Sequence, residues 1–355
     1  MHTTKRTILA AAVSILITGY THADEHFAEI VQIGNDNNVT QSQSGIGQRA
    51  SSSQSGFLLI TDIEQLGARN SAITYQAGPE SQIQIIQDGA ANQVRVDQAA
   101  EVTGHRASIF QTGAVNEASV EQLEGVGNGT SLTQIGDANV ANVQQQGFGG
   151  SFNGVQEGVS NVLSVVQLSA TSARTVQTGS DNVITLSQDG FPYGSFASIS
   201  QDGTGNEATL DQRATGRYPS GDVQLTQTGT DNLADVTTQI AFGNFAFTQD
   251  GTGNELTARS VGLDVSFVGS SVGDYNRVTV DQDGRDISLV INQYGDNNEI
   301  DIEQSGLSGS ASFEQTGNEN YAAVIRTGEY ENMGGDSSAV MQNGMGNSAV
   351  IMQSQ

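Results

Sequence analysis

One short pattern, Gln-x-Gly-x-x-Asn followed by alternating residues and a second Gln, recurs along almost the whole chain. Intact copies begin at Gln32, Gln87, Gln111, Gln201, Gln293 and Gln342. A fixed period of this kind is typical of a solenoid, in which each repeat buries its inner face only against its neighbours. The pattern constrains the fold more strongly than any other feature of the sequence.

The Gly-x-x-Asn part of the pattern aligns most of the chain in one register, and a degenerate copy at residues 43–54 fills the largest gap. We expect each glycine to occupy a tight turn, because such turns need backbone conformations that a Cβ disfavours. The predicted turn residues are Gly34, Gly67, Gly89, Gly113, Gly136, Gly158, Gly179, Gly203, Gly229, Gly251, Gly273, Gly295, Gly317 and Gly344.

The residues between the turns alternate in polarity with period two, which is the spacing of a strand. Ile83, Ile85 and Gln87 share one face, and after the next turn Val94 and Val96 share another. Each repeat is therefore predicted to be strand, turn and strand, with a second turn leading onward. The predicted fold class is all-β: an amyloid-like β-solenoid of about fourteen or fifteen layers around a thin aliphatic core.

Stacking such repeats places equivalent residues about 4.8 Å apart, so that Gln meets Gln and Asn meets Asn. Each amide both donates and accepts, and a buried column of amides therefore satisfies itself. This predicts a structural ladder. Its predicted members are Gln32, Asn37, Gln43, Gln65, Asn70, Gln76, Gln87, Asn92, Gln98, Gln111, Asn116, Gln122, Gln134, Asn139, Gln145, Gln156, Asn161, Gln167, Gln177, Asn182, Gln188, Gln201, Asn206, Gln212, Gln293, Asn298, Gln304, Gln342, Asn347 and Gln353.

The amino-terminal residues differ from the repeats. Lys5 and Arg6 precede an apolar run at residues 8–17, and small residues follow up to Ala23, which predicts a secretory signal peptide over residues 1–23. A short segment, residues 24–29, then leads to the repeat region at residues 30–355. Loss of the two basic residues takes the formal net charge from −26 to −28.

The composition narrows the function classes. A chain with 39 Asp and Glu against 13 Lys and Arg is a poor ligand for nucleic acid or anionic membranes. Low hydrophobicity with high charge is also typical of disorder, but a disordered chain needs no Gly, Asn and Gln at fixed offsets. Because the chain has no Cys, its stability outside the cell must come from backbone pairing and side-chain ladders.

No catalytic, cofactor or metal site is predicted. His26 and His105 are the only histidines beyond residue 23, and no Ser, His and acid cluster stands out. His105 takes the strand-start position that Ser81 holds in another repeat. Acidic turns such as residues 136–139 and 295–298 suggest calcium, but the Gly-Gly-x-Gly-x-Asp signature of calcium-binding β-solenoids is absent.

Several further positions depart from the repeat. Aspartates that follow a Gln are either solvated turn residues or gatekeepers, whose stacked like charges slow premature assembly. Residues 213–222 and 327–338 are predicted to lengthen return turns and bulge outward. Arg326 replaces a Gln and is expected to reach solvent, because a buried unpaired guanidinium is costly. The possible gatekeepers are Asp88, Asp189, Asp202, Asp250 and Asp283.

In its best copies, such as residues 195–212, the repeat reads Ser-x₅-Gln-x-Gly-x-x-Asn-x-Ala-x₃-Gln and closely resembles the curlin repeats of bacterial curli subunits. The resemblance covers about residues 30–353. It implies a secreted subunit that polymerises with itself into extracellular amyloid fibres at the bacterial cell surface, for biofilm matrix and cell adhesion. It also implies a nucleating subunit and an outer-membrane secretion channel as partners.

Three features differ from that family pattern. The chain has more repeats than typical curli subunits, and only residues 24–29 stand where the major subunit carries a glycine-rich targeting segment. The last repeat, residues 342–353, is intact and uncharged, unlike the basic last repeat expected of a nucleating subunit. The sequence leaves the choice between major and minor subunit open.

A monomeric acidic β-solenoid that acts as a surface adhesin or ligand-binding protein is the alternative function. Such a solenoid should carry polar caps at both ends. The repeats run almost to both ends of the sequence, which favours the fibre subunit.

Overall fold

The computed structural model describes residues 14–17, 25–190, 194–213, 221–241, 244–263, 266–327 and 336–354. The chain divides into two compact units, residues 1–149 and 150–355. The described residues are all-β without a helix and make about 13 turns of β-solenoid, which confirms the predicted fold class. They therefore include no helix with the length and hydropathy of a transmembrane span.

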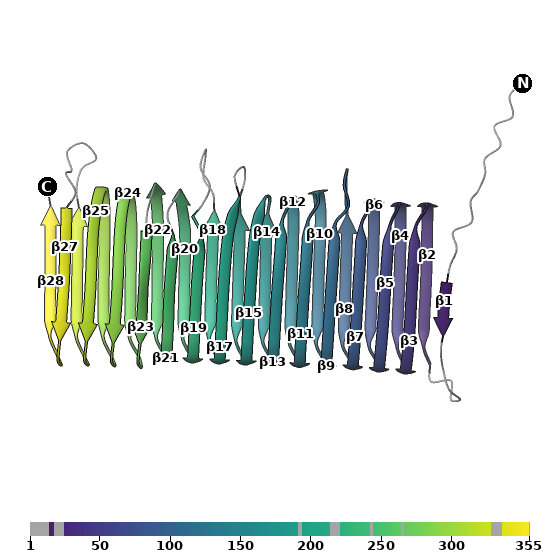
Figure 1. The fold of residues 1–355 in the computed structure, drawn as a ribbon, viewed down its shortest axis with the longest axis horizontal. Helices are drawn as coiled ribbons and strands as arrows, with labels where there is room; N and C mark the ends of the chain where they lie inside the picture. Colours follow the sequence, from purple (N-terminus) through teal and green to yellow (C-terminus); the bar gives the residue numbers. More distant parts are fainter. Residues whose placement is uncertain are drawn as a thin grey trace, which may run out of the picture. The chain divides into compact units, whose positions relative to one another are not determined.

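The first unit contains two parallel sheets built from alternate strands, which run in opposite directions (Figure 1). Each strand pairs with the strands two before and two after it. The even sheet consists of β2 (Phe27–Asn35), β4 (Arg49–Phe57), β6 (Ser71–Pro79), β8 (Gln93–Ala99), β10 (Glu117–Val126) and β12 (Val140–Phe148). The odd sheet consists of β3 (Asn38–Ile46), β5 (Ile60–Ala68), β7 (Gln82–Ala90), β9 (Arg106–Ala114) and β11 (Gly129–Asp137).

A further short strand, β1 (Ser14–Ile17), pairs in parallel with β3, with Ser14 opposite Thr40. It lies inside the predicted signal peptide. The rest of that segment, residues 1–13 and 18–24, lies outside the described residues, so the signal peptide and its cleavage after Ala23 stay a prediction.

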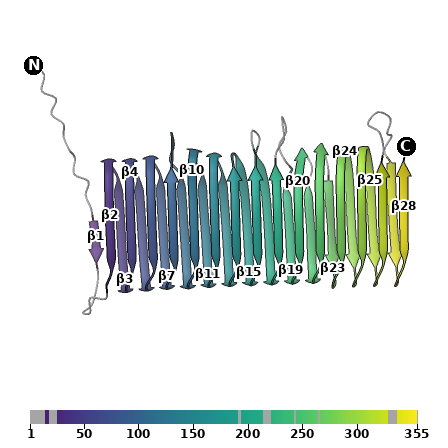
Figure 2. The ribbon, with the colours of Figure 1, turned by 180° about the vertical axis from the view of Figure 1, so that it is seen from behind.

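The second unit repeats the arrangement, and the view from behind shows its other sheet (Figure 2). Its odd sheet contains β13 (Ser151–Val159), β15 (Thr171–Ser180), β17 (Ser195–Thr204), β19 (Val223–Thr230), β21 (Phe245–Thr252), β23 (Ser266–Val272) and β27 (Asp336–Asn343). Its even sheet contains β14 (Val162–Leu168), β16 (Val183–Asp189), β18 (Glu207–Arg213), β20 (Leu233–Ala241), β22 (Glu255–Leu263), β26 (Tyr321–Thr327) and β28 (Ser348–Ser354).

Two long strands of the second unit belong to both of its sheets. β24 (Arg277–Tyr294) and β25 (Glu299–Thr316) each contain 18 residues. The first half of β24 pairs with β22 and its second half pairs with β23. The return corner of these layers is therefore made by continuous strand.

The core is the thin aliphatic layer that the alternation predicts. Ile83, Ile85, Val94 and Val96 are at most 3% exposed. Strands pair in register, so that Gln65 stands opposite Gln87 and each inward residue meets its equivalent in the next layer. A parallel, in-register stack therefore turns the sequence period directly into columns of like side chains.

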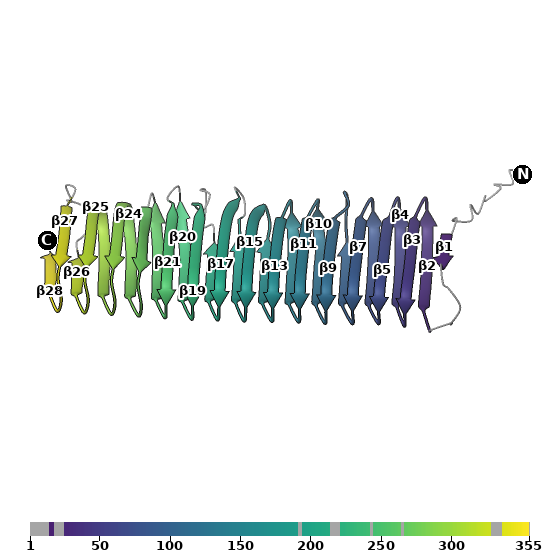
Figure 3. The same ribbon diagram turned by 60° about the horizontal axis from the view of Figure 1, so that its bottom comes forward.

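Backbone geometry explains the turn sequence, and Figure 3 shows the turns along both edges of each unit. Gly89 has φ 135°, and a Cβ there would lie 2.0 Å from the carbonyl oxygen of Gly113 in the next layer. Two residues later Ala91 has φ 56°, which is left-handed. The stacked carbonyl therefore excludes every side chain at the first position, whereas the second position tolerates one at a cost.

Val115 occupies that second, left-handed position with φ 59° and is 57% exposed. Left-handed geometry is costly for a β-branched residue, and Gly205 and Gly253 hold the same position in other layers. We expect Val115→Gly to raise the free energy of unfolding by about 0.5–1 kcal/mol. Denaturant unfolding followed by circular dichroism measures this. A lower stability than that of the parent chain would contradict the assigned strain.

Candidate functional site: the amide columns

Glutamine side chains form hydrogen-bonded columns inside both units. In the odd sheet of the first unit, Gln87 Nε2 donates to Gln111 Oε1 at 2.8 Å, and Gln111 Nε2 donates to Gln134 Oε1 at 2.7 Å. In the second unit, Gln177 donates in the same way to Gln201 at 3.0 Å. The direction is the same at each step, because each amide donates to the layer that follows it in the sequence.

The second amide hydrogen of these glutamines bonds to the backbone of the opposite sheet. Gln111 Nε2 also donates to the backbone oxygen of Gln93 at 3.1 Å, and Gln87 Nε2 donates to that of Ser71 at 3.2 Å. Each acceptor residue lies at the start of a strand in the opposite sheet. The fully buried amides of Gln87 and Gln111 thus use their oxygen and both hydrogens, so their burial leaves no polar atom unpaired.

Asparagines form a second kind of column at the turns. The backbone N–H of Asn116 donates to Asn92 Oδ1 at 3.0 Å, and Asn92 Nδ2 donates to the carbonyl of Gly113 at 2.9 Å. Asn206 repeats both contacts in the second unit, accepting from Asn232 N and donating to Gly229 O. The side-chain amide of each of these asparagines therefore donates to the carbonyl of the turn glycine in the next layer.

The register of the first repeat differs from the prediction. Gly34 stacks on Gly56, whereas Gly45 stacks on Gly67, so the two glycines that the alignment joined lie at opposite edges of the unit. The layers at this end of the chain contain 22 residues, and the interval of 33 residues from Gly34 to Gly67 is therefore one and a half layers.

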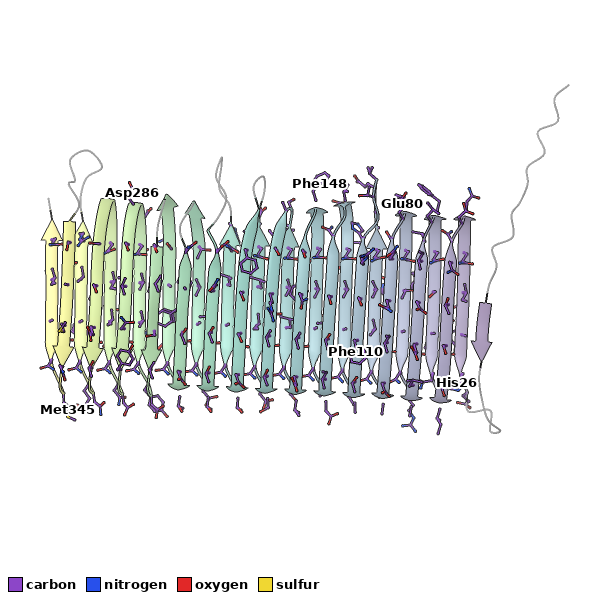
Figure 4. The ribbon with its side chains drawn as sticks, in the orientation of Figure 1. His26, Glu80, Phe110, Phe148, Asp286 and Met345 are labelled. Atoms are coloured by element: carbon purple, nitrogen blue, oxygen red, sulfur yellow. The ribbon has the colours of Figure 1, made fainter. Side chains whose placement is uncertain are left out.

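The two edges are visible in the first unit, where Figure 4 labels His26 at one edge and Glu80 at the other. Asn37 belongs to the edge of Glu80, where its Oδ1 accepts from Leu59 N at 3.1 Å. At the edge of His26 the first amide in the column is Gln48, whose Oε1 accepts from Asn70 N at 3.0 Å. Asn37 thus makes the predicted kind of contact, but in the column at the edge of Glu80 and not in the column that contains Asn70.

Some column members were not among the predicted residues. Asn232, Asn254, Asn276 and Asn320 are such members, and the Gly-x-x-Asn spacing identifies them. The added glutamines each stand two residues before a glycine, and this Gln-x-Gly pair is the signal that identifies them. Gln48 substitutes for Asn after Gly45 and carries no such signal. The added glutamines are Gln54, Gln227, Gln249, Gln282 and Gln315, all buried.

The even column of the second unit is interrupted after Gln212. Its next two layers carry Thr238 and Ser260, whose hydroxyl oxygens are buried without a hydrogen-bond partner. Gln212 Nε2 donates instead to the carbonyl of Gly221 at 2.6 Å. This stretch therefore lacks the side-chain part of the ladder.

Arg326 is buried, which corrects the expectation that it reaches solvent. Its residue is 4% exposed, and its guanidinium donates to Gln353 Oε1 at 2.9 Å, Ser338 Oγ at 2.8 Å and the carbonyl of Ser310 at 3.2 Å. These three acceptors pair the guanidinium, whose burial without partners was expected to cost too much free energy. Because Arg has no acceptor, the Nε2 of Gln304 in the preceding layer is left without a partner.

The five candidate gatekeeper aspartates do not stack on one another, so the predicted column of like charges is absent among the described residues. Each has uncharged or basic neighbours in its column. Asp88 lies between Leu66 and Thr112, Asp189 between Leu168 and Arg213, Asp202 between Thr178 and Thr228, Asp250 between Thr228 and Val272, and Asp283 between Val261 and Ser305.

Like charges do stack at other positions, and an arginine accompanies them. Asp97 stands opposite Glu121, and Arg95 forms an ion pair with Asp97 at 2.7 Å, which raises the pKa of Arg95. Asp281 stands opposite Glu303, with an arginine 3.6 Å from Asp281. At both places an arginine partly neutralises the two carboxylates that face each other across adjacent layers.

The acidic turns have a structural role. Asp137 Oδ1 accepts from Ala114 N, Asp274 Oδ1 from Thr252 N and Asp296 Oδ1 from Asp274 N, each at 2.9 Å. Within the described part of the chain, no group of three His, Asp or Glu side chains could hold a metal ion. The expected bulges fall largely on residues 214–220 and 328–335, which lie outside the described residues.

His105 is a buried column member. Its Nδ1 accepts from Asn128 N at 3.2 Å, and its Nε2 lies 3.3 Å from the carbonyl of Ala99. These contacts require a neutral ring with the proton on Nε2. Burial lowers the pKa of His105 below its ordinary value of 6.5, although the hydrogen bond to Ala99 opposes the shift.

Residues 295–328 match the family model of the curlin associated repeat. This match is consistent with a curlin-repeat protein, as the sequence pattern indicates. The matched segment contains Gly295, Asn298, Gln304 and Gln315, which are a turn and column residues of the second unit. A comparison of the whole sequence with curated proteins gave no match. The curlin repeat and the β-solenoid fold indicate a structural protein, and curlin-family proteins are generally extracellular.

The glutamine column makes a prediction about stability. Gln111→Leu leaves Gln87 Nε2 without its acceptor and Gln134 Oε1 without its donor in a dry interior. We expect the free energy of unfolding to fall by about 2–4 kcal/mol in denaturant titration. Phe110→Thr is the matched control, since Phe110 faces outward on the same strand and stands opposite Thr133. It should change stability by about 0.5 kcal/mol or less. Equal losses in both variants would refute the column's role.

His105 makes a prediction about pH. The folded pKa is lowered, so below pH 6.5 the unfolded chain takes up a proton that the folded chain refuses. The stability that His105 contributes is fully present above that pH and is lost as the pH falls toward the folded pKa. His105→Asn, which places the residue of Asn128 in the same column, should remove this part of the acid sensitivity. Thermal unfolding of both chains between pH 7.5 and pH 5 compares them, and parallel pH curves would contradict the assignment.

Proposed function

We propose that the chain is a secreted structural subunit that polymerises head to tail into curli-like extracellular amyloid fibres, which serve biofilm matrix and cell adhesion. The main observation behind this proposal is the amide column, whose side-chain hydrogen bonds all run in one direction along the stack. Wherever glutamines stand in successive layers of a column, the amide of one donates to the next, for example from Gln43 to Gln65 and from Gln315 to Gln342. A stack of this kind has a donor side and an acceptor side, and a second copy can continue it only in the same orientation.

The outermost described layers have capacity for such continuation. Gln32 Oε1, the first acceptor of its column, has no hydrogen-bond partner among the described residues. Gln342 Oε1 accepts from Gln315 in the preceding layer, and Gln342 Nε2 donates one hydrogen to the carbonyl of Tyr321, which leaves its second hydrogen without a partner among the described residues. An acceptor on one side and a donor on the other are complementary, which supports strand addition between copies.

The acidic surface fits this proposal. With a formal net charge of −26, side-by-side approach of two copies is repelled over most of their surfaces. End-to-end approach instead forms a full set of backbone and amide hydrogen bonds. Polarity and charge together favour a filament. The proposal also includes export through a secretion channel and a separate nucleating subunit. These two parts rest only on the curlin repeat.

Polymerisation is tested with the chain from residue 24 onward. We expect concentration-dependent growth with seeds, followed by amyloid-dye fluorescence, and cross-β diffraction at about 4.8 Å. Gln342→Leu should slow seeded growth about tenfold or more, because an added copy meets a layer without its donor. Met341→Leu, a change at the adjacent outward-facing residue, is the control. A chain that stays monomeric at high concentration would refute the fibre and favour the adhesin.

A further inference from the structure

The two faces of the second unit differ in charge. We call the outward-facing side chains of β19, β21, β23 and residues 287–294 of β24 the neutral face. Among the described residues of this face the only ionisable carboxylate is Asp250, and no Lys or Arg is present. The remaining members are Gln224, Thr226, Thr228, Thr230, Ala246, Thr248, Thr252, Ser266, Val268, Ser270, Val272, Ser288, Val290, Asn292 and Tyr294.

The opposite face of the same layers is highly charged. There the outward positions of β18, β20, β22 and the first halves of β24 and β25 carry acids and arginines. Arg277 lies 3.5 Å from Glu255, and Arg259 lies 3.6 Å from Asp281. The charged members are Glu207, Asp211, Arg213, Asp235, Glu255, Arg259, Arg277, Asp281, Asp283, Glu299, Asp301 and Glu303.

An apolar stripe runs across the middle of the neutral face. Ala246 stands opposite Val268, and Val268 stands opposite Val290, in three successive layers. Val268 is 45% exposed, Val290 39% and Tyr294 45%. Stacked apolar side chains on an otherwise polar protein mark a surface that gains free energy when it is covered.

The size of the surface fits a stable contact. With the flanking strands β17 and residues 309–316 of β25, which add one outward-facing acid each, Asp202 and Glu314, it spans six strands of about seven residues. At about 4.8 Å between strands and about 3.3 Å per residue, this is about 670 Å² per copy and about 1,300 Å² for a pair. Specific interfaces bury about 1,200–2,000 Å² in total.

We propose that the neutral face binds the same face of a second copy of this chain, sheet against sheet. Charge selects this partner: two copies of so acidic a protein repel each other wherever their carboxylates meet, and this face lets them approach with few charges between them. Valine, threonine and serine side chains from both copies interdigitate when the sheets lie about 10 Å apart. The contact is lateral, so it does not depend on end-to-end polymerisation.

The test measures lateral association of the full chain by sedimentation velocity before fibres form, and filament width by electron microscopy where they form. Salt at about 0.15 M screens long-range repulsion. We expect a concentration-dependent dimer and paired filaments. Val268→Lys combined with Val290→Lys should weaken the dimer at least about tenfold and give single filaments, because covering a lysine without a partner costs free energy.

Thr257→Lys combined with Thr279→Lys is the matched control. These threonines stand opposite each other in the middle of the charged face, and the pair adds the same two charges. The control should dimerise like the parent chain. Val268→Thr combined with Val290→Thr keeps strand-forming residues and should also weaken the dimer, with circular dichroism confirming the fold.

Three results would overturn the proposal: a parent chain that is monomeric with single filaments, equal association in the two lysine variants, or no effect of either valine variant. Failure of seeded fibre growth leaves the dimer measurable in solution. The lateral contact and the polymerisation can therefore fail separately.

Discussion

The structure depends on in-register hydrogen bonding between parallel strands one layer apart. This pairing places Gln87 under Gln111 and Gly89 under Gly113, so that an inward polar group meets the equivalent residue of the next repeat. An amide is the side chain that profits most, since it donates in one direction and accepts from the other. Burial of a polar residue, which is costly in an ordinary core, stabilises this one because the column is continuous.

The same constraint explains where the chain departs from its pattern. Thr238 and Ser260 stand where the column would carry amides, and their hydroxyls are buried without partners. Arg326 is long enough, but it lacks an acceptor, so it is satisfied by Gln353 and Ser338 and leaves the amide of Gln304 unpaired. A column tolerates a residue other than an amide where neighbouring layers supply hydrogen-bond acceptors. Each such residue interrupts the run of amide hydrogen bonds along the column.

Much of the candidate site could be predicted from residues alone, because offsets within a repeat translate directly into faces. Gln111 and Asn116 lie in buried columns as their spacing indicates, and the left-handed turn residues follow from Gly-x-x-Asn. Gln227 and Gln249 escaped notice because their repeats keep Gln-x-Gly but lose the closing Gln. The arrangement of Asp88 and Asp202 was misjudged, because whether two charges stack depends on the residue in the next layer and not on their common offset.

The sequence by itself determined the period, the inward and outward alternation, the turn glycines and the self-satisfying amides, because each of these is local to one repeat. Only the tertiary structure decided which strand lies on which. Both halves of a layer carry a similar Gln-x-Gly pattern, so Gly34 aligns equally well with either edge until closure of the 22-residue layer selects one. The same stacking decided that Arg326 is buried and that the outward face of β19, β21, β23 and residues 287–294 of β24 carries a single carboxylate, because each result depends on neighbours a full layer apart.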